Sequence, residues 1–140
     1  MGQIEPLYTT EVTAIGARNG RVTSQDGVLD HTLKAPGGDG AADATNPEQL
    51  FAAGYAACFQ GALYGAARKA KVDPAESEVK AAVSLGKEDS GAYGLSVTLT
   101  VRIPGVSRDT VQQIADAAHE TCPYSRATRG NIDVSVIAAD

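Results

Sequence analysis

One stretch, Asn46–Phe59, constrains the chain most, because it opens as a helix and continues with small and apolar residues. Asn46 is a favourable N-cap, and Pro47 at the first helical position loses no hydrogen bond there. Gln49 can reach back to the Asn46 amide, as in a capping box. The spacing of apolar residues predicts a helix over about 47–71. We expect its core-facing stripe to hold Leu50, Phe51, Gly54, Cys58, Gly61, Ala62 and Gly65.

The size and charge of the chain exclude several classes of protein. A length of 140 residues predicts a single domain, 1–140. The net charge of −5 argues against binding to nucleic acid or to an anionic membrane surface. No stretch approaches the ~20 apolar residues of a membrane helix, and the first residues do not read as a secretory signal. We therefore expect a soluble cytoplasmic protein, in which a lasting structural disulfide is unexpected.

The other elements predict an α+β fold. Asn19-Gly20 is a strong hairpin signal. Residues 95–103 alternate apolar with polar side chains and give the clearest strand. Ser107 can cap a second helix, and Pro123 is expected to end it. Strands segregated from helices predict antiparallel sheets flanking two main helices. The expected strands are 8–15, 22–24, 28–33, 78–86, 95–103 and 132–136.

Cys58 and Cys122 lie on the apolar faces of the two predicted helices, and three interpretations are open. Both can be small buried hydrophobic residues, which is common. A zinc site with His119 and Cys122 lacks the usual ligand spacings. A redox pair would use one thiolate to attack an electrophile and the second thiol to form a disulfide. His31 and His119 are more typical of surface or hydrogen-bonded histidines, so a cysteine hydrolase, which needs a histidine base, ranks last.

A redox pair needs a nearby cation, because burial alone raises a thiol pKa. Arg18 and Arg21 flank the predicted turn, and Glu48 could orient such an arginine. On an unbroken helix, however, Glu48 and Cys58 are separated by about 15 Å of rise. We therefore predict either a bend near Gly54 or a position for Glu48 in the loosely wound first turn.

Three blocks occur in a characteristic order: Arg18–Gly20, then Thr45–Tyr55 with Cys58-Phe59, then Cys122–Ile132. They resemble the organic hydroperoxide resistance proteins (Ohr), which are thiol peroxidases of the OsmC-like superfamily. The resemblance covers essentially the whole chain, and the Cys-Pro-Tyr-Ser run favours the Ohr branch. Two departures are mild: residue 126 is arginine where lysine is more usual, and the loop 35–45 holds more Ala and Asp than is typical.

The resemblance implies roles for four residues. Cys58 matches the peroxidatic cysteine and Cys122 the resolving cysteine. Arg18 matches the arginine that stabilises the thiolate and binds the peroxide, and Glu48 matches the glutamate that orients this arginine. It also implies an OsmC-like fold and an intertwined homodimer with active sites at the subunit interface. Neither a metal nor a bound cofactor is expected.

The resemblance further implies a reaction. Members reduce alkyl and fatty-acid hydroperoxides to alcohols through a cysteine sulfenic acid and an intramolecular disulfide. A dithiol, such as a lipoyl group on a partner protein, restores both thiols. Phe51, Phe59 and Tyr124 adjoin the reactive positions and could line an apolar pocket or simply belong to the core. The alternative is a redox-sensing or ligand-binding OsmC-like protein without efficient peroxidase turnover.

Overall fold

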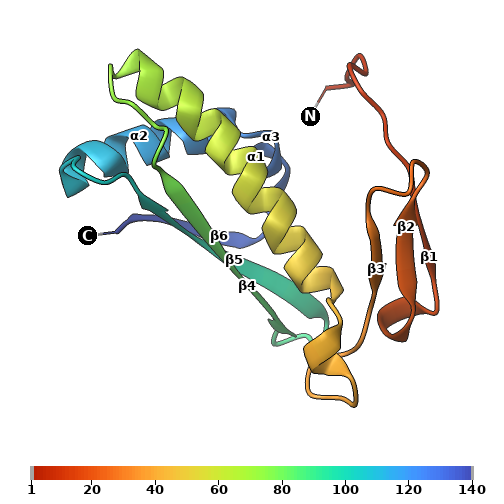
Figure 1. Cartoon of the computed structure of the whole chain (residues 1–140). Coiled ribbons are helices and arrows are strands. Elements are labelled where there is room, and N and C mark those ends of the chain that lie inside the picture. Colours follow the sequence, from red (N-terminus) through yellow and green to blue (C-terminus); the bar gives the residue numbers. More distant parts are fainter. Residues whose placement is uncertain (1, 140) are drawn as a thin grey trace. The chain divides into compact units, whose positions relative to one another are not determined.

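In the computed structural model, which describes residues 2–139, the chain divides into two units that meet at Pro47–Glu48. The first unit holds a three-stranded antiparallel sheet of β1 (Val12–Ile15), β2 (Arg21–Ser24) and β3 (Asp30–Thr32), seen in Figure 1. Two 3-10 turns, η1 (Ala17–Asn19) and η2 (Ala41–Asp43), complete it. The predicted first three strands are thus present, although β1 begins at Val12 and not at position 8.

The first hairpin closes through a five-residue loop and not through a two-residue Asn-Gly turn. Ile15 pairs with Arg21, and η1 fills the loop between them. A Cβ built on Gly20 would lie 1.7 Å from the Ile15 carbonyl oxygen, so only glycine fits this position. The Asn-Gly pair therefore marks the hairpin correctly, because its glycine permits a close backbone approach.

The second unit contains the helices and a mixed sheet. Its order is α1 (Pro47–Lys69), β4 (Glu78–Lys87), β5 (Tyr93–Arg102), α2 (Arg108–Thr121), α3 (Pro123–Thr128) and β6 (Asp133–Ala138). β4 and β5 form an antiparallel hairpin, whereas β6 pairs parallel to β5. The α+β class is confirmed, but the prediction of antiparallel pairing alone is wrong for β6. The helical connection through α2 and α3 returns the chain in the direction of β5.

The helix α3 was not predicted, because Pro123 was interpreted only as a stop. It does end α2, yet it also occupies the first position of α3, where proline is favourable.

The cap of α2 is as expected, since the Ser107 hydroxyl accepts a hydrogen bond from the Thr110 amide. The predicted apolar face of α2 is confirmed as buried: Val111, Ile114, Ala115, Ala118 and, just beyond the helix, Cys122.

The buried face of α1 differs from the predicted stripe. Its fully buried residues are Tyr55, Phe59, Leu63 and Ala67, four residues apart, and they pack with β5 and α2. Gly61 and Gly65, which were expected in the stripe, are exposed. The large side chains decide the orientation of the helix, since they bury far more apolar area than Gly or Ala. Cys58 lies at the edge of this face and is partly buried.

Leu63→Ala should lower the free energy of unfolding by about 2–5 kcal/mol, because it leaves a cavity in a well-packed core. Leu63 has 0% exposure and belongs to the main core cluster. Lys69→Ala, at the exposed end of α1, is the control and should change stability by less than about 0.5 kcal/mol. Urea unfolding measures both. Similar midpoints for the two variants would show that this core contributes little.

Candidate active site

The structure brings the two cysteines together. Cys58 comes from the middle of α1, and Cys122 lies between α2 and α3; their Sγ atoms are 3.8 Å apart. Both are free thiols, with Cys122 fully buried and Cys58 partly exposed to solvent. A disulfide needs a separation of about 2.05 Å, so the sulfurs must approach by less than 2 Å to bond. This arrangement favours a redox pair over two unrelated buried cysteines.

Local sequence explains both positions. The last apolar residue on the buried face of α2 is Cys122, and it also serves as the residue before the first turn of α3. Pro123 forces the chain out of α2 at this point, because proline cannot donate the next helical hydrogen bond. Cys58 follows Tyr55 by three residues, so it shares the side of α1 that packs against this junction.

Within the second unit, the surroundings of Cys58 favour the protonated thiol. Burial raises the pKa of Cys58, and the neighbouring Cys122 adds to this rise. The backbone N–H of Tyr124 acts in the opposite direction and lowers the pKa. Since burial is the largest of these effects, a reactive thiolate at position 58 requires a cation. The sequence analysis also predicts a cation near the reactive thiol.

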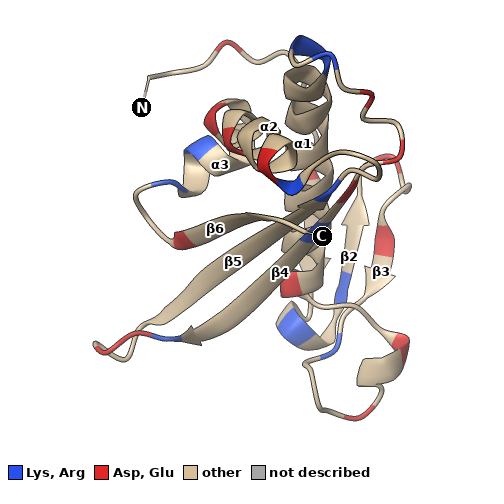
Figure 2. Cartoon of the chain, turned by 90° about the vertical axis from the view of Figure 1, so that its left-hand side faces the viewer, with Lys and Arg blue, Asp and Glu red and all other residues tan. Residues whose placement is uncertain are grey.

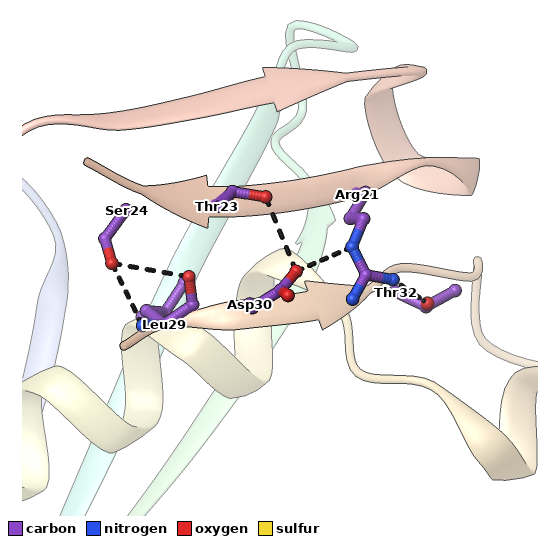
Figure 3. Close-up of polar contacts among 6 residues, drawn as sticks. All are labelled: Arg21, Thr23, Ser24, Leu29, Asp30 and Thr32. Carbon is purple, nitrogen blue, oxygen red and sulfur yellow. Dashed lines mark hydrogen bonds and ion pairs between the residues drawn. The ribbon is translucent and has the colours of Figure 1, made fainter. Parts of the chain in front are cut away.

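Of the two arginines proposed as that cation, Arg21 is already engaged. Its Nε donates to Asp30 Oδ1 at 2.6 Å and its Nη1 donates to Thr32 Oγ1 at 2.8 Å. Figure 3 shows how these residues lie. The pair holds the pKa of Arg21 above and that of Asp30 below its ordinary value. Arg18 lies in η1. Because Arg18 and Cys58 belong to different units, their pairing stays a prediction.

Glu48 lies in the first turn of α1, which is α-helix from Pro47 onward, so the loosely wound start expected at Glu48 is not observed. The helix continues through Gly54 to Lys69 without interruption, as Figure 1 also shows, so the prediction of a bend near Gly54 is wrong. Ten residues of helix place Glu48 and Cys58 about 15 Å apart along the axis. One guanidinium can hardly contact both groups within a single chain.

The three aromatic residues expected near the pocket differ in burial. Phe59 is fully buried and packs against the His119 ring, so it forms core behind the cysteines. Phe51 is partly buried, and Tyr124 is 40% exposed. A Cβ on Gly54 would lie 3.2 Å from the Tyr124 hydroxyl oxygen. The absence of a side chain at Gly54 thus lets the Tyr124 ring rest on α1, one turn before Cys58.

A group of four side chains beside the cysteines was missed by sequence reasoning. We call it the hydroxyl cluster: Tyr55, His119, Ser125 and Thr128. The Tyr55 hydroxyl lies 2.8 Å from Ser125 Oγ and 3.1 Å from Thr128 Oγ1, and His119 Nδ1 lies 2.7 Å from Ser125 Oγ. The available signal was a tyrosine three residues before one cysteine and a serine three residues after the other.

His119 is a hydrogen-bonded histidine, as the sequence suggested. Burial and the nearby Arg129 lower its pKa, which favours the neutral ring. Its Nδ1 is hydrogen-bonded to Ser125, and the Arg129 guanidinium donates to its carbonyl oxygen.

Over residues 2–139, no three His, Cys, Asp or Glu side chains gather closely enough to hold a metal ion. Nor is any helix in this range long and apolar enough to cross a membrane.

Charged residues are spread over several elements in Figure 2, where the ribbon of the strands β4–β6 is mainly tan. Burial is the largest local effect that opposes a thiolate at Cys58, and Cys122 adds to it.

The chain is similar to known proteins over most of its length. The OsmC-like protein family profile matches residues 38–137. The chain is 49% identical over 140 residues to the organic hydroperoxide resistance protein OhrA of Bacillus subtilis, covering 97% of this chain and 99% of that protein. It is 47% identical over 137 residues to an organic hydroperoxide resistance protein of Xanthomonas axonopodis pv. citri, with 95% of each covered.

A solved structure extends the agreement to three dimensions. The crystal structure of Bacillus subtilis OhrB superposes with a TM-score of 0.88 at 48% identity, covering 96% of this chain and 100% of that one. These matches span both cysteines and both units. The chain therefore belongs to the OsmC-like family and, within it, to the organic hydroperoxide resistance proteins.

Proposed function

We propose that this protein reduces organic hydroperoxides to alcohols, with Cys58 as the peroxidatic and Cys122 as the resolving cysteine. The observation that carries the proposal is the 3.8 Å separation of the two sulfurs, one partly exposed and the other buried. A partly exposed sulfur can meet a substrate, and a buried one is protected from it. The relatives named organic hydroperoxide resistance proteins supply the substrate class.

The proposed cycle has three steps: peroxide reduction, disulfide formation and reduction of the disulfide by a dithiol. The Cys58 thiolate attacks the terminal oxygen of ROOH, the O–O bond breaks, and the departing alkoxide takes a proton and leaves as ROH. Cys58 is then a sulfenic acid, oxidised by two electrons. The Cys122 sulfur attacks Cys58, a disulfide forms, and water leaves. An external dithiol, for which we propose a protein-bound lipoyl group, reduces this disulfide and becomes a disulfide itself.

Arg18 would serve this cycle twice. Its guanidinium would hold Cys58 as a thiolate, and it would stabilise the charge that grows on the leaving oxygen. A shift of two pKa units corresponds to about 2.7 kcal/mol, a reasonable effect for one largely desolvated guanidinium. The raised pKa of Cys58 within its own unit supports the need for such a cation.

We also propose a homodimer with the active sites at the subunit interface. Among the described residues of the first unit, only Val22 and Leu33 are buried hydrophobic residues. The exposed ones are Ile4, Leu7, Tyr8, Val12, Ile15 and Val28. Such apolar surface favours a partner.

An alkyl hydroperoxide should be the better substrate. With tert-butyl hydroperoxide, kcat/KM should exceed that with hydrogen peroxide by about a hundredfold, because four buried carbon groups at about 0.8 kcal/mol each give about 3 kcal/mol. Phe51 and Tyr124 offer the apolar surface for this contact. Steady-state consumption of the two peroxides measures the ratio. Equal efficiencies would remove the apolar pocket from the proposal.

The reductant should be a dithiol. We propose a cytoplasmic location, where thiols are kept reduced. Dihydrolipoamide should sustain turnover, while an equal thiol concentration of 2-mercaptoethanol should support it at least about tenfold more slowly. A dithiol completes the second exchange within one molecule, whereas a monothiol leaves a mixed disulfide. Turnover with both reductants under otherwise identical conditions tests this, and equal rates would contradict it.

A further inference from the structure

The position of Cys122 depends on α3, a helix of only six residues. Helices this short are marginal on their own, so contacts with the rest of the fold must fix them. The Tyr55 hydroxyl supplies such contacts from α1, at 2.8 Å from Ser125 Oγ and 3.1 Å from Thr128 Oγ1. Tyr55 and Ser125 have 0% exposure, and Thr128 has 8%. No water competes easily for these hydrogen bonds.

A second contact joins the same two helices. The Tyr124 ring lies close to Gly54 and 5.8 Å, centre to centre, from the Tyr55 ring. Two groups at the start of α3 also interact with the Cys58 sulfur. One is Cys122 Sγ, at 3.8 Å, and the other is the Tyr124 backbone N–H, which lowers the pKa of Cys58. A shift of α3 along α1 would therefore move both groups away from Cys58.

We propose that the Tyr55 hydroxyl is a positioning group for the thiol chemistry: by binding Ser125 and Thr128, it holds Cys122 Sγ and the Tyr124 amide against Cys58. The inference rests on the proposed function for its biological meaning but not for its test. A sulfur held in place reacts as if present at high concentration, whereas a sulfur on a loosened segment must first be ordered.

The substitution Tyr55→Phe tests the proposal, because it removes the hydroxyl and keeps the buried ring. Tyr64→Phe is the matched control: it is the same change on the same helix, at a ring that lies against the Arg68 guanidinium. Each reduced protein is equilibrated with mixtures of oxidised and reduced dithiothreitol. Cys58 and Cys122 lose two protons and two electrons in forming their disulfide, and oxidised dithiothreitol gains them in becoming the dithiol. Alkylation and mass spectrometry give the disulfide fraction.

We expect the equilibrium constant for disulfide formation to fall about tenfold in Tyr55→Phe and to stay within about twofold in Tyr64→Phe. The Cys58 pKa, followed through thiolate absorbance in a Cys122→Ser background, should rise further in Tyr55→Phe because the Tyr124 amide moves away. A general loss of stability, checked by circular dichroism, would not by itself produce this pair of changes in a folded protein. Unchanged values in Tyr55→Phe would overturn the inference.

Ser125→Ala provides the second variant if Tyr55→Phe does not fold. It removes the atom shared by Tyr55 and His119, so the same decrease is expected, and a wild-type equilibrium would overturn the inference. No step of this experiment uses a peroxide. Failure of the proposed function would leave wild-type protein forming its disulfide without peroxidase turnover, whereas failure of the present inference would leave the variants equal to wild type.

Discussion

Cys58→Ser should reduce alkyl hydroperoxide turnover, measured with excess dihydrolipoamide, by a factor on the order of 10³ or more. The hydroxyl of serine is far less acidic and less nucleophilic than a thiol, so no sulfenic acid can form at this position. Loss of a nucleophile is commonly among the largest effects that one substitution has on an enzyme. Peroxide consumption in a coupled assay, with the buffer rate subtracted, gives the factor.

Cys122→Ser is the matched control, since the residue belongs to the later step. This variant should still react once with an alkyl hydroperoxide and then hold Cys58 as a sulfenic acid, which dimedone can trap. In the wild-type protein, whose two sulfurs are 3.8 Å apart, the proposed cycle converts that intermediate to the disulfide. Continued turnover by Cys58→Ser would reject the peroxidase and favour the redox-sensing or ligand-binding alternative.

Arg18→Ala should slow peroxide reduction about a hundredfold and shift the Cys58 reaction to higher pH. Without the proposed guanidinium, burial outweighs the Tyr124 amide and keeps the pKa of Cys58 above its ordinary value. At a fixed pH below that pKa, the thiolate fraction falls about tenfold for each unit by which the pKa rises. The alkylation rate with iodoacetamide, measured from pH 5 to 10, reports this shift without any peroxide.

Arg21→Ala is the comparison, because Arg21 is bound to Asp30 and Thr32 on the neighbouring strand. Its loss should leave both the peroxidase rate and the alkylation profile within about threefold of wild type, since exposed ion pairs contribute little. An Arg21→Ala defect as large as that of Arg18→Ala would reverse the assignment. Identical alkylation profiles for Arg18→Ala and wild type would remove Arg18 from thiolate stabilisation.

Local signals predicted most of the secondary structure. Pro47 does start the long helix, Ser107 does cap the second helix, and the alternation over 95–103 does become β5. Each signal acts within a few residues, so it can be read without knowing the fold. The parallel pairing of β6 with β5 could not be read in this way. It depends on where the connection through α2 and α3 places β6 relative to β5, and no local sequence pattern specifies this position.

The orientation of α1 shows a second limit. The stripe through Gly61 was periodic, but glycine and alanine bury little area, and the residues that became core were Tyr55, Phe59 and Leu63. A helix rich in small residues offers several nearly equivalent faces, and the packing partners choose among them. The same choice left Cys58 at the edge of the core, where a sulfur can be both desolvated and reachable.

The amino-acid sequence alone determined where the two main helices begin, the positions of the two cysteines, and the family motifs in which these cysteines lie. Only the folded chain decided that these thiols lie 3.8 Å apart and that Tyr55 and Ser125 meet beside them. Contacts between residues more than sixty positions apart depend on how whole elements pack, and packing responds to the summed surface of many side chains. Chemistry at this site therefore rests on distances that no single segment encodes.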